Sequence, residues 1–221
     1  MYYHLIPVPF AVAGIIIYWF ARQTNDLTTV SIVQPVITIL CVIIALLSLT
    51  RKNTDKRLTA WIVAGLVIAL LGDFLNLDMT DPFVVIRGLI IAVVAYLTYA
   101  VGLTRLNGFH RKDIYVGIVA IFLYGVLMNY LWPFLGDMKI PGMIYGLVLP
   151  FVVTRAISTF FGDTFSTTQA VLLTAGTAML YIGDLEFALH TYPKIMPMLF
   201  GPFLYSGGQL LIALSPSYGK R

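Results

Sequence analysis

The chain has 221 residues, of which 59% are hydrophobic and 11% are charged, with a net charge of +4 and a mean hydropathy of +0.90. Soluble globular domains are about half apolar and about a quarter charged, so the composition excludes an ordinary soluble enzyme, a disordered segment and a nucleic-acid-binding domain. The single cysteine, Cys41, excludes a disulfide framework and a cysteine-based metal site. We therefore expect residues 1–221 to form one polytopic, all-α membrane domain.

Eight apolar runs are long enough to cross a bilayer, which takes about 20 residues of helix. None shows the alternating pattern of a membrane β-barrel strand. The first run has no positively charged segment before it and no small-residue cleavage site after it, so we expect a span and not a signal peptide. The runs cover residues 5–21, 30–49, 58–77, 83–104, 114–132, 141–158, 168–188 and 195–214.

Lysine and arginine are distributed unequally between the two sets of connecting segments. Ten lie on the side of the chain termini, including four in residues 51–57 and three in residues 105–112, whereas four lie on the other side. Cytoplasmic segments of membrane proteins carry an excess of Lys and Arg. The pattern therefore predicts that both termini are cytoplasmic.

The sequence contains a weak internal similarity at an offset of 111 residues. Gly65 and Asp73 in the third run recur as Gly176 and Asp184 in the seventh. Because four spans preserve orientation, we interpret the offset as a parallel repeat of two four-helix halves; a chance match of common residues is the alternative. Small residues on one helix face also predict that the third and the seventh span are each closely packed in the interior of the bundle. The two halves cover approximately residues 1–110 and 111–221.

Asp73 and Asp184 are the charged residues that most need an explanation. Both fall near the outer ends of apolar runs, and a carboxylate at mid-membrane costs about 3 kcal/mol on insertion scales. Apolar surroundings and a second carboxylate nearby both disfavour the charged form, so one group of a pair can stay protonated while the other is ionised. Such a pair can act as general acid and general base. The alternative is structural: neutral or hydrogen-bonded carboxyl groups that only hold the bundle together.

Other polar side chains are predicted at the same depth, where they would orient water and substrate. Asn76 follows Asp73 by three residues and Tyr181 precedes Asp184 by three, so each shares a helix face with an aspartate. Gln34, Asn129 and Gln209 lie in three further runs.

Two charged residues are interpreted as peripheral. We expect Glu186 at the rim of the site, near His190, and Arg155 to extend its charge to the cytoplasmic interface. The three histidines lie at span ends or in connecting segments and form no spaced ligand set. No serine has a buried histidine partner, so a Ser-His-Asp hydrolase is not predicted.

Several segments resemble the lysoplasmalogenase family, the YhhN-like membrane proteins. Residues 70–73, Leu-Leu-Gly-Asp, are similar to the Gly-Asp motif of that family, and residues 176–184 to its second acidic motif, with Gly183 where Ser is usual. Residues 205–212 resemble its closing Tyr-x-x-x-Gln-x-Leu-Ile stretch, and residues 145–156 its sixth span. Two further positions depart from the family: Gln34 stands where Lys is usual, and Tyr96 stands where His is usual.

The resemblance implies hydrolysis of the vinyl ether bond of a lysoplasmalogen, which releases a fatty aldehyde and glycerophosphoethanolamine or glycerophosphocholine. This chemistry needs an acid that protonates carbon and a carboxylate that stabilises the cation or activates water, as in glycosidases with two carboxylates. We assign these catalytic roles to Asp73 and Asp184. The residues expected to bind substrate are Gln34, Asn76, Tyr96, Tyr99, Asn129, Tyr181 and Gln209.

The scheme requires no metal and no organic cofactor. The expected partners are a lysophospholipid or another lipid substrate and the membrane itself, with no nucleic acid. A different class of function stays open, because parallel repeats and acidic residues within spans also occur in transporters. The alternative is therefore a proton- or cation-coupled transporter or a lipid-binding membrane protein.

Overall fold

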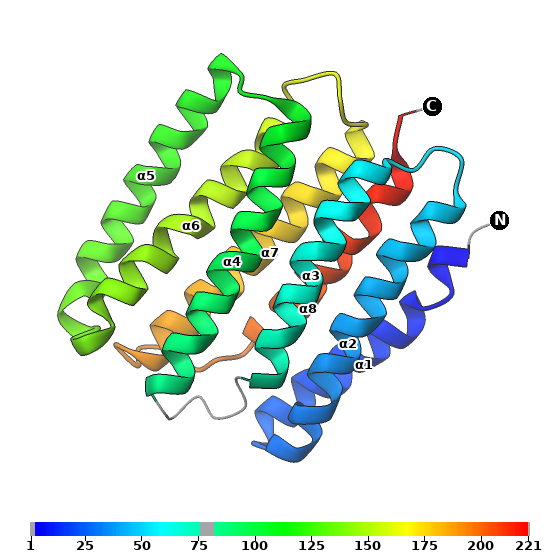
Figure 1. The fold of residues 1–221 in the computed structure, drawn as a ribbon. Helices are drawn as coiled ribbons and strands as arrows, with labels where there is room; N and C mark the ends of the chain where they lie inside the picture. The colour runs from blue at the N-terminus through cyan, green and yellow to red at the C-terminus, as the bar shows by residue number, and fades with distance from the viewer. Residues whose placement is uncertain (1–2, 76–81, 221) are drawn as a thin grey trace.

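The structure is a computed structural model that describes residues 3–75 and 82–220. In these residues it contains eight α-helices and no strand, which confirms the predicted all-α class (Figure 1). The helices are α1 (Val8–Gln23), α2 (Leu27–Leu47), α3 (Lys56–Leu75), α4 (Pro82–Asn107), α5 (Arg111–Leu131), α6 (Lys139–Ser158), α7 (Thr167–Thr191) and α8 (Gly201–Leu214).

Within the part of the chain that the structure describes, seven helical stretches are long and apolar enough to cross a membrane, so the chain is a polytopic integral membrane protein. The last helix, α8, has 14 residues and is shorter than the predicted run, because residues 195–200 are not helical. A 3-10 turn, Ser215–Tyr218, continues it toward the C-terminus. Both ends of the described chain lie at the same end of the bundle (Figure 1).

Polar residues at the connecting segments set where several helices begin. Asp26 precedes α2, and its carboxylate accepts hydrogen bonds from the Thr29 backbone N (3.1 Å) and the Thr29 hydroxyl (2.5 Å). These bonds lower the pKa of Asp26, because they favour the charged form. Ser166 and Gln169 form a capping box at the start of α7, which satisfies two helix-end donors.

The helices pack in the same order in both halves of the chain. α1 packs on α2, α2 on α3 and α3 on α4, and α5, α6, α7 and α8 repeat this sequence of contacts. The halves meet where α4 contacts α6 and where α8 contacts α2. This arrangement is the one that a parallel repeat would produce, and the duplication itself stays a prediction.

Helix α5 lies at one edge of the bundle, beside α6 (Figure 1). Its large apolar side chains are accessible: Ile118 and Ile121 are each 61% exposed and Phe122 is 67% exposed. Such a surface is unfavourable in water but suits the hydrocarbon of a bilayer.

Two helix contacts depend on glycine. A Cβ atom at Gly176 of α7 would lie 2.7 Å from Ile212 Cγ1 and 2.8 Å from the Gly208 carbonyl oxygen of α8. A Cβ atom at Gly65 of α3 would overlap the ring of Tyr99 on α4. Both pairs of helices therefore approach more closely than a larger residue would allow, as the glycine spacing predicted.

Candidate functional site

Asp73 lies near the end of α3 and is only 2% exposed. Its Oδ1 accepts hydrogen bonds from Gln34 Nε2 (2.7 Å) and from the Tyr205 hydroxyl (3.2 Å). Its Oδ2 accepts a hydrogen bond from the Thr38 hydroxyl (2.5 Å). Because Gln34 and Thr38 belong to α2 and Tyr205 belongs to α8, the Asp73 carboxyl group joins three helices.

The Thr38 hydroxyl also lies 2.9 Å from Gln209 Oε1 on α8, within hydrogen-bond distance. A threonine hydroxyl has one hydrogen, and here it faces two close acceptors, Asp73 Oδ2 and Gln209 Oε1. Two arrangements satisfy both contacts: a protonated Asp73 that donates to Thr38, or a Gln209 amide turned so that its Nε2 donates to Thr38.

The positively charged Arg22 is linked to Asp73 through one intervening side chain, that of Gln34. Arg22, at the end of α1, donates a hydrogen bond from Nη2 to Gln34 Oε1 (3.5 Å), and its guanidinium lies 5.6 Å from the centre of the Tyr18 ring. Gln34 therefore links the Arg22 cation to the Asp73 carboxyl group through its two amide ends.

Asp184 of α7 is held by two tyrosines from two other helices. Tyr145 of α6 (2.7 Å) and Tyr96 of α4 (3.0 Å) both donate to its Oδ2, and their ring centres are 6.1 Å apart. Asp184 is half-buried, so it is more accessible than Asp73.

The two carboxyl environments follow the offset seen in the sequence. Tyr145 stands 111 residues after Gln34, as Asp184 does after Asp73. In each half the second helix thus supplies a donor, Gln34 or Tyr145, to the aspartate of the third helix.

Tyr205 of α8 donates a hydrogen bond to Asp73, whereas Asp184 is held from α4 and α6. These two sets of hydrogen bonds together form the polar network in the interior of the bundle.

The structure brings some of the predicted binding residues to this network. Gln34 reaches Asp73, Tyr96 reaches Asp184, and Gln209 reaches Asp73 through Thr38. The two departures from the lysoplasmalogenase pattern, Gln34 and Tyr96, are therefore both direct partners of an aspartate.

Other predicted residues lie elsewhere. Tyr99 packs against Gly65, and its buried hydroxyl has no hydrogen-bond partner in the described part of the chain. Tyr181 packs against the apolar core, and Asn129 is exposed on α5, away from both carboxyl groups. Asn76 lies outside the described residues.

Three residues of the network were not predicted as site residues: Thr38, Tyr145 and Tyr205. A signal existed for two of them. Thr38 is four residues after Gln34 and so shares its helix face, and Tyr145 is the counterpart of Gln34 at the repeat offset. The position of Tyr205 depends on how α8 crosses α3, which no local pattern specifies.

The prediction for Glu186 was wrong. Glu186 is only 6% exposed, and its carboxyl oxygens accept hydrogen bonds from the backbone N of Leu199 (2.7 Å) and of Phe200 (3.0 Å). His190 instead lies 3.1 Å from the Met196 carbonyl oxygen. The sequence does not show that residues 199–200 fold back over α7. Their backbone N–H groups need an acceptor there, and the Glu186 carboxyl group supplies it.

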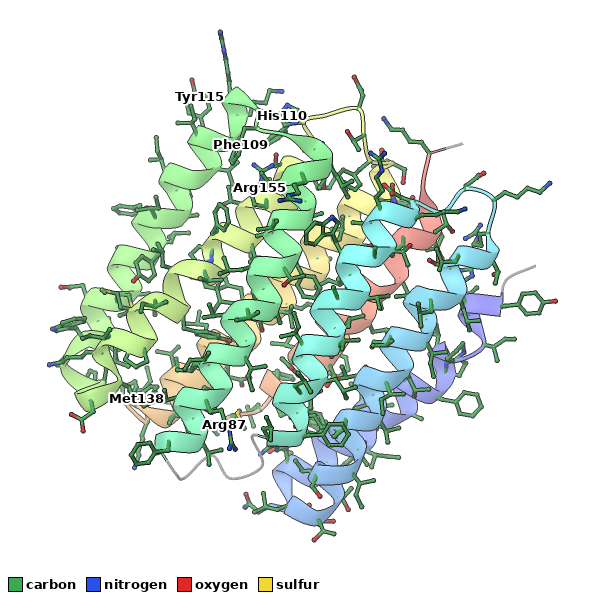
Figure 2. The ribbon with its side chains drawn as sticks, viewed as in Figure 1. Arg87, Phe109, His110, Tyr115, Met138 and Arg155 are labelled. Carbon is green, nitrogen blue, oxygen red and sulfur yellow. The ribbon has the colours of Figure 1, made fainter. Side chains whose placement is uncertain are left out.

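The prediction for Arg155 was also wrong. Arg155 is 1% exposed and pairs with Asp113 (2.7 Å), and it also donates to the Gly108 carbonyl oxygen. Its guanidinium lies 4.5 Å from the ring centre of Phe109, and Figure 2 shows Phe109 and His110 close to it. Asp113 and the Gly108 carbonyl oxygen accept hydrogen bonds from both terminal nitrogens of this guanidinium inside the protein, so its charge does not extend to the interface.

Among residues 3–75 and 82–220, no group of three His, Cys, Asp or Glu side chains is placed to hold a metal ion.

The fold and the site define a polytopic helical membrane protein whose interior holds a pair of hydrogen-bonded carboxyl groups. The model of the YhhN family matches residues 30–216, so the chain belongs to this family. The matched segment includes both aspartates and all their described hydrogen-bond partners. No curated protein and no solved structure matches the chain.

Proposed function

We propose that this protein is a membrane lysoplasmalogenase that hydrolyses the vinyl ether bond of lysoplasmalogens with Asp73 and Asp184, and that both termini are cytoplasmic. The observation that carries the proposal is a pair of carboxyl groups inside an apolar bundle, each held by hydrogen bonds from side chains of other helices. Membership of the YhhN family and the resemblance to lysoplasmalogenases support it.

Vinyl ether hydrolysis begins with proton transfer to the carbon of the double bond that is farther from the ether oxygen, which forms an oxocarbenium ion at the carbon beside the oxygen. Water then adds to the carbon beside the oxygen and loses a proton, and the hemiacetal breaks down to an aldehyde and the glycerol hydroxyl. The reaction needs one proton donor and one group that stabilises positive charge and accepts a proton from water. Two carboxyl groups in different protonation states meet both needs.

We assign the proton donor to Asp73. It is the more buried of the two, and a protonated Asp73 is one of the two arrangements that satisfy both contacts of the Thr38 hydroxyl. Its other partners, Gln34 and Tyr205, are neutral donors that would hold the carboxyl group in one orientation.

We assign charge stabilisation and water activation to Asp184. It is the more accessible group, and both tyrosine donors engage its Oδ2, which leaves Oδ1 for water. Tyr96 and Tyr145 hold the Asp184 carboxyl group in one orientation by donating to Oδ2.

The test uses purified protein with an alkenyl lysophospholipid and measures aldehyde release. Asp73→Asn and Asp184→Asn should each abolish release, and Tyr145→Phe should reduce it by about 10²-fold, a typical effect of disturbing acid–base catalysis. Asn129→Ala, on the exposed face of α5, is the control and should leave the rate unchanged. Normal aldehyde release by the Asp73→Asn/Asp184→Asn double variant, or proton-coupled uptake by vesicles without any aldehyde, would overturn the proposal.

Infrared spectroscopy of the same variants tests the assignment of the two roles. A carbonyl band of a protonated carboxylic acid should disappear in Asp73→Asn and persist in Asp184→Asn. The opposite result would exchange the two roles and leave the pair itself intact.

A further inference from the structure

A polar pocket lies at the opposite end of the bundle from the two aspartates. Three segments that are far apart in the sequence meet there: the α2–α3 loop, the α6–α7 loop and the C-terminal segment after α8 (Figure 1). The pocket has a volume of about 400 Å³. It is lined by Lys52, Asn53, Thr54, Asp55, Thr164, Gln169, Gly219 and Lys220.

The pocket contains a buried donor without a partner. Gln169 is 1% exposed, and its Oε1 accepts a hydrogen bond from the Ser166 backbone N (3.1 Å) at the start of α7. Its Nε2 has no hydrogen-bond partner in the described part of the chain. A buried amide N–H that lacks an acceptor is unfavourable, and Gln169 lines the pocket, so an acceptor bound beside it would remove this cost.

The charges around the pocket favour an anion. Lys52 and Lys220 both line it, and residues 51–57 contain four Lys and Arg in total. The one acidic side chain in the lining, Asp55, is engaged at the start of α3, where its Oδ1 accepts hydrogen bonds from the backbone N of Arg57 and Leu58 (3.0 Å each). Asp163 lies next to the pocket, and its backbone oxygen accepts a hydrogen bond from Lys220.

The walls of the pocket are fixed by packing. A Cβ atom at Gly219 would overlap the Asn53 carbonyl oxygen, and the Ser166 hydroxyl donates to the Tyr218 carbonyl oxygen. The C-terminal segment is therefore held against both loops, so that Lys52 and Lys220 line the same pocket.

We infer that this pocket binds a phosphate group, with Lys52 and Lys220 supplying positive charge and Gln169 Nε2 donating a hydrogen bond. The phosphate can belong to a soluble compound or to the headgroup of an anionic lipid, because the pocket lies at the end of the bundle. The site is separate from the proposed hydrolytic site: α3 begins beside the pocket, and Asp73 is near its other end, about 25 Å away along the helix at 1.5 Å per residue.

The test measures binding of inorganic phosphate to the purified full-length protein in phosphatidylcholine nanodiscs by equilibrium dialysis. Lys52→Gln and Gln169→Glu should each weaken binding about tenfold or more, since each removes a donor to an anion. Gln169→Glu retains Oε1 as the acceptor for Ser166, so the start of α7 stays capped. The matched control is Lys56→Gln, which removes the same charge from an exposed residue of the same segment that does not line the pocket.

A second arm identifies the source of the phosphate. Hydrogen exchange of residues 163–170 and 215–219 is compared in nanodiscs of phosphatidylcholine alone and of phosphatidylcholine with phosphatidic acid. Protection by phosphatidic acid that Lys52→Gln abolishes would support the site with a lipid ligand, and saturable phosphate binding alone would support it with a soluble ligand. No binding in either arm, or equal loss in Lys56→Gln, would overturn the inference, and neither outcome bears on aldehyde release.

Discussion

Glu186 holds the beginning of α8, and its removal should destabilise the protein. The Glu186→Ala substitution would remove the buried carboxyl group that accepts hydrogen bonds from the backbone N–H groups of Leu199 and Phe200. A hydrogen bond to a charged group contributes about 1.5–3 kcal/mol, and a carboxylate at a helix N-terminus adds about 0.3–1 kcal/mol. Allowing for non-additivity, we expect the free energy of unfolding to fall by about 3 kcal/mol.

Two features of the structure keep this loss from becoming complete unfolding. Trp19 Nε1 donates to the Leu199 carbonyl oxygen (2.5 Å), and Gln23 Nε2 donates to the same oxygen (3.2 Å) and to that of Met198 (3.1 Å). The segment before α8 therefore remains tied to α1 in the variant. Glu186→Gln retains an acceptor oxygen and loses the charge, so it should cost only about 1 kcal/mol.

The buried thiol of Cys41 provides the assay. Cys41 is fully buried, so a maleimide dye should react with it only when the bundle opens. Thermal unfolding followed by this reaction should rank wild type, Glu186→Gln and Glu186→Ala in order of falling stability. Asp137→Ala, at an exposed acidic residue of another loop, is the control and should change stability by less than about 0.5 kcal/mol. A Glu186→Ala protein as stable as wild type would refute the capping role.

Two other predictions concern packing and acid stability. Gly176→Ala should lower the free energy of unfolding by about 1–3 kcal/mol in the same assay, because its Cβ atom would meet the α8 backbone. Gly125→Ala, the control, has open space at its Cβ position and should be neutral or slightly stabilising. Equal effects of the two substitutions would contradict the close contact between α7 and α8. The lowered pKa of Asp26 means that its stabilising contribution is present above the pKa of the unfolded chain and is lost as pH falls through the folded value. Unfolding of Asp26→Asn should therefore depend less on pH in the acidic range, and an unchanged pH dependence would count against this cap.

The positions of the helices could be predicted from the sequence because hydropathy is a local property. A run of about 20 apolar residues must be helical in a bilayer, since every backbone donor and acceptor then bonds within the segment. The same argument identified Asp73 and Asp184, because a carboxyl group inside an apolar run stands out without any tertiary information. The prediction was least accurate for the last span, because α8 begins at Gly201 and is shorter than its apolar run. The segment before it is held to Glu186 by a hydrogen bond from the backbone N of Phe200.

The composition and spacing of the chain by themselves determined that it is an all-α membrane protein with an acidic residue near the end of the third and the seventh span. Only the tertiary structure decided which donors meet each carboxyl group, that Glu186 caps a helix, and that Arg155 is buried in an ion pair. These contacts join residues separated by up to 132 positions, as between Tyr205 and Asp73. They depend on how each helix is rotated and where it crosses its neighbours, and that is set by packing across the whole bundle and not by any local pattern.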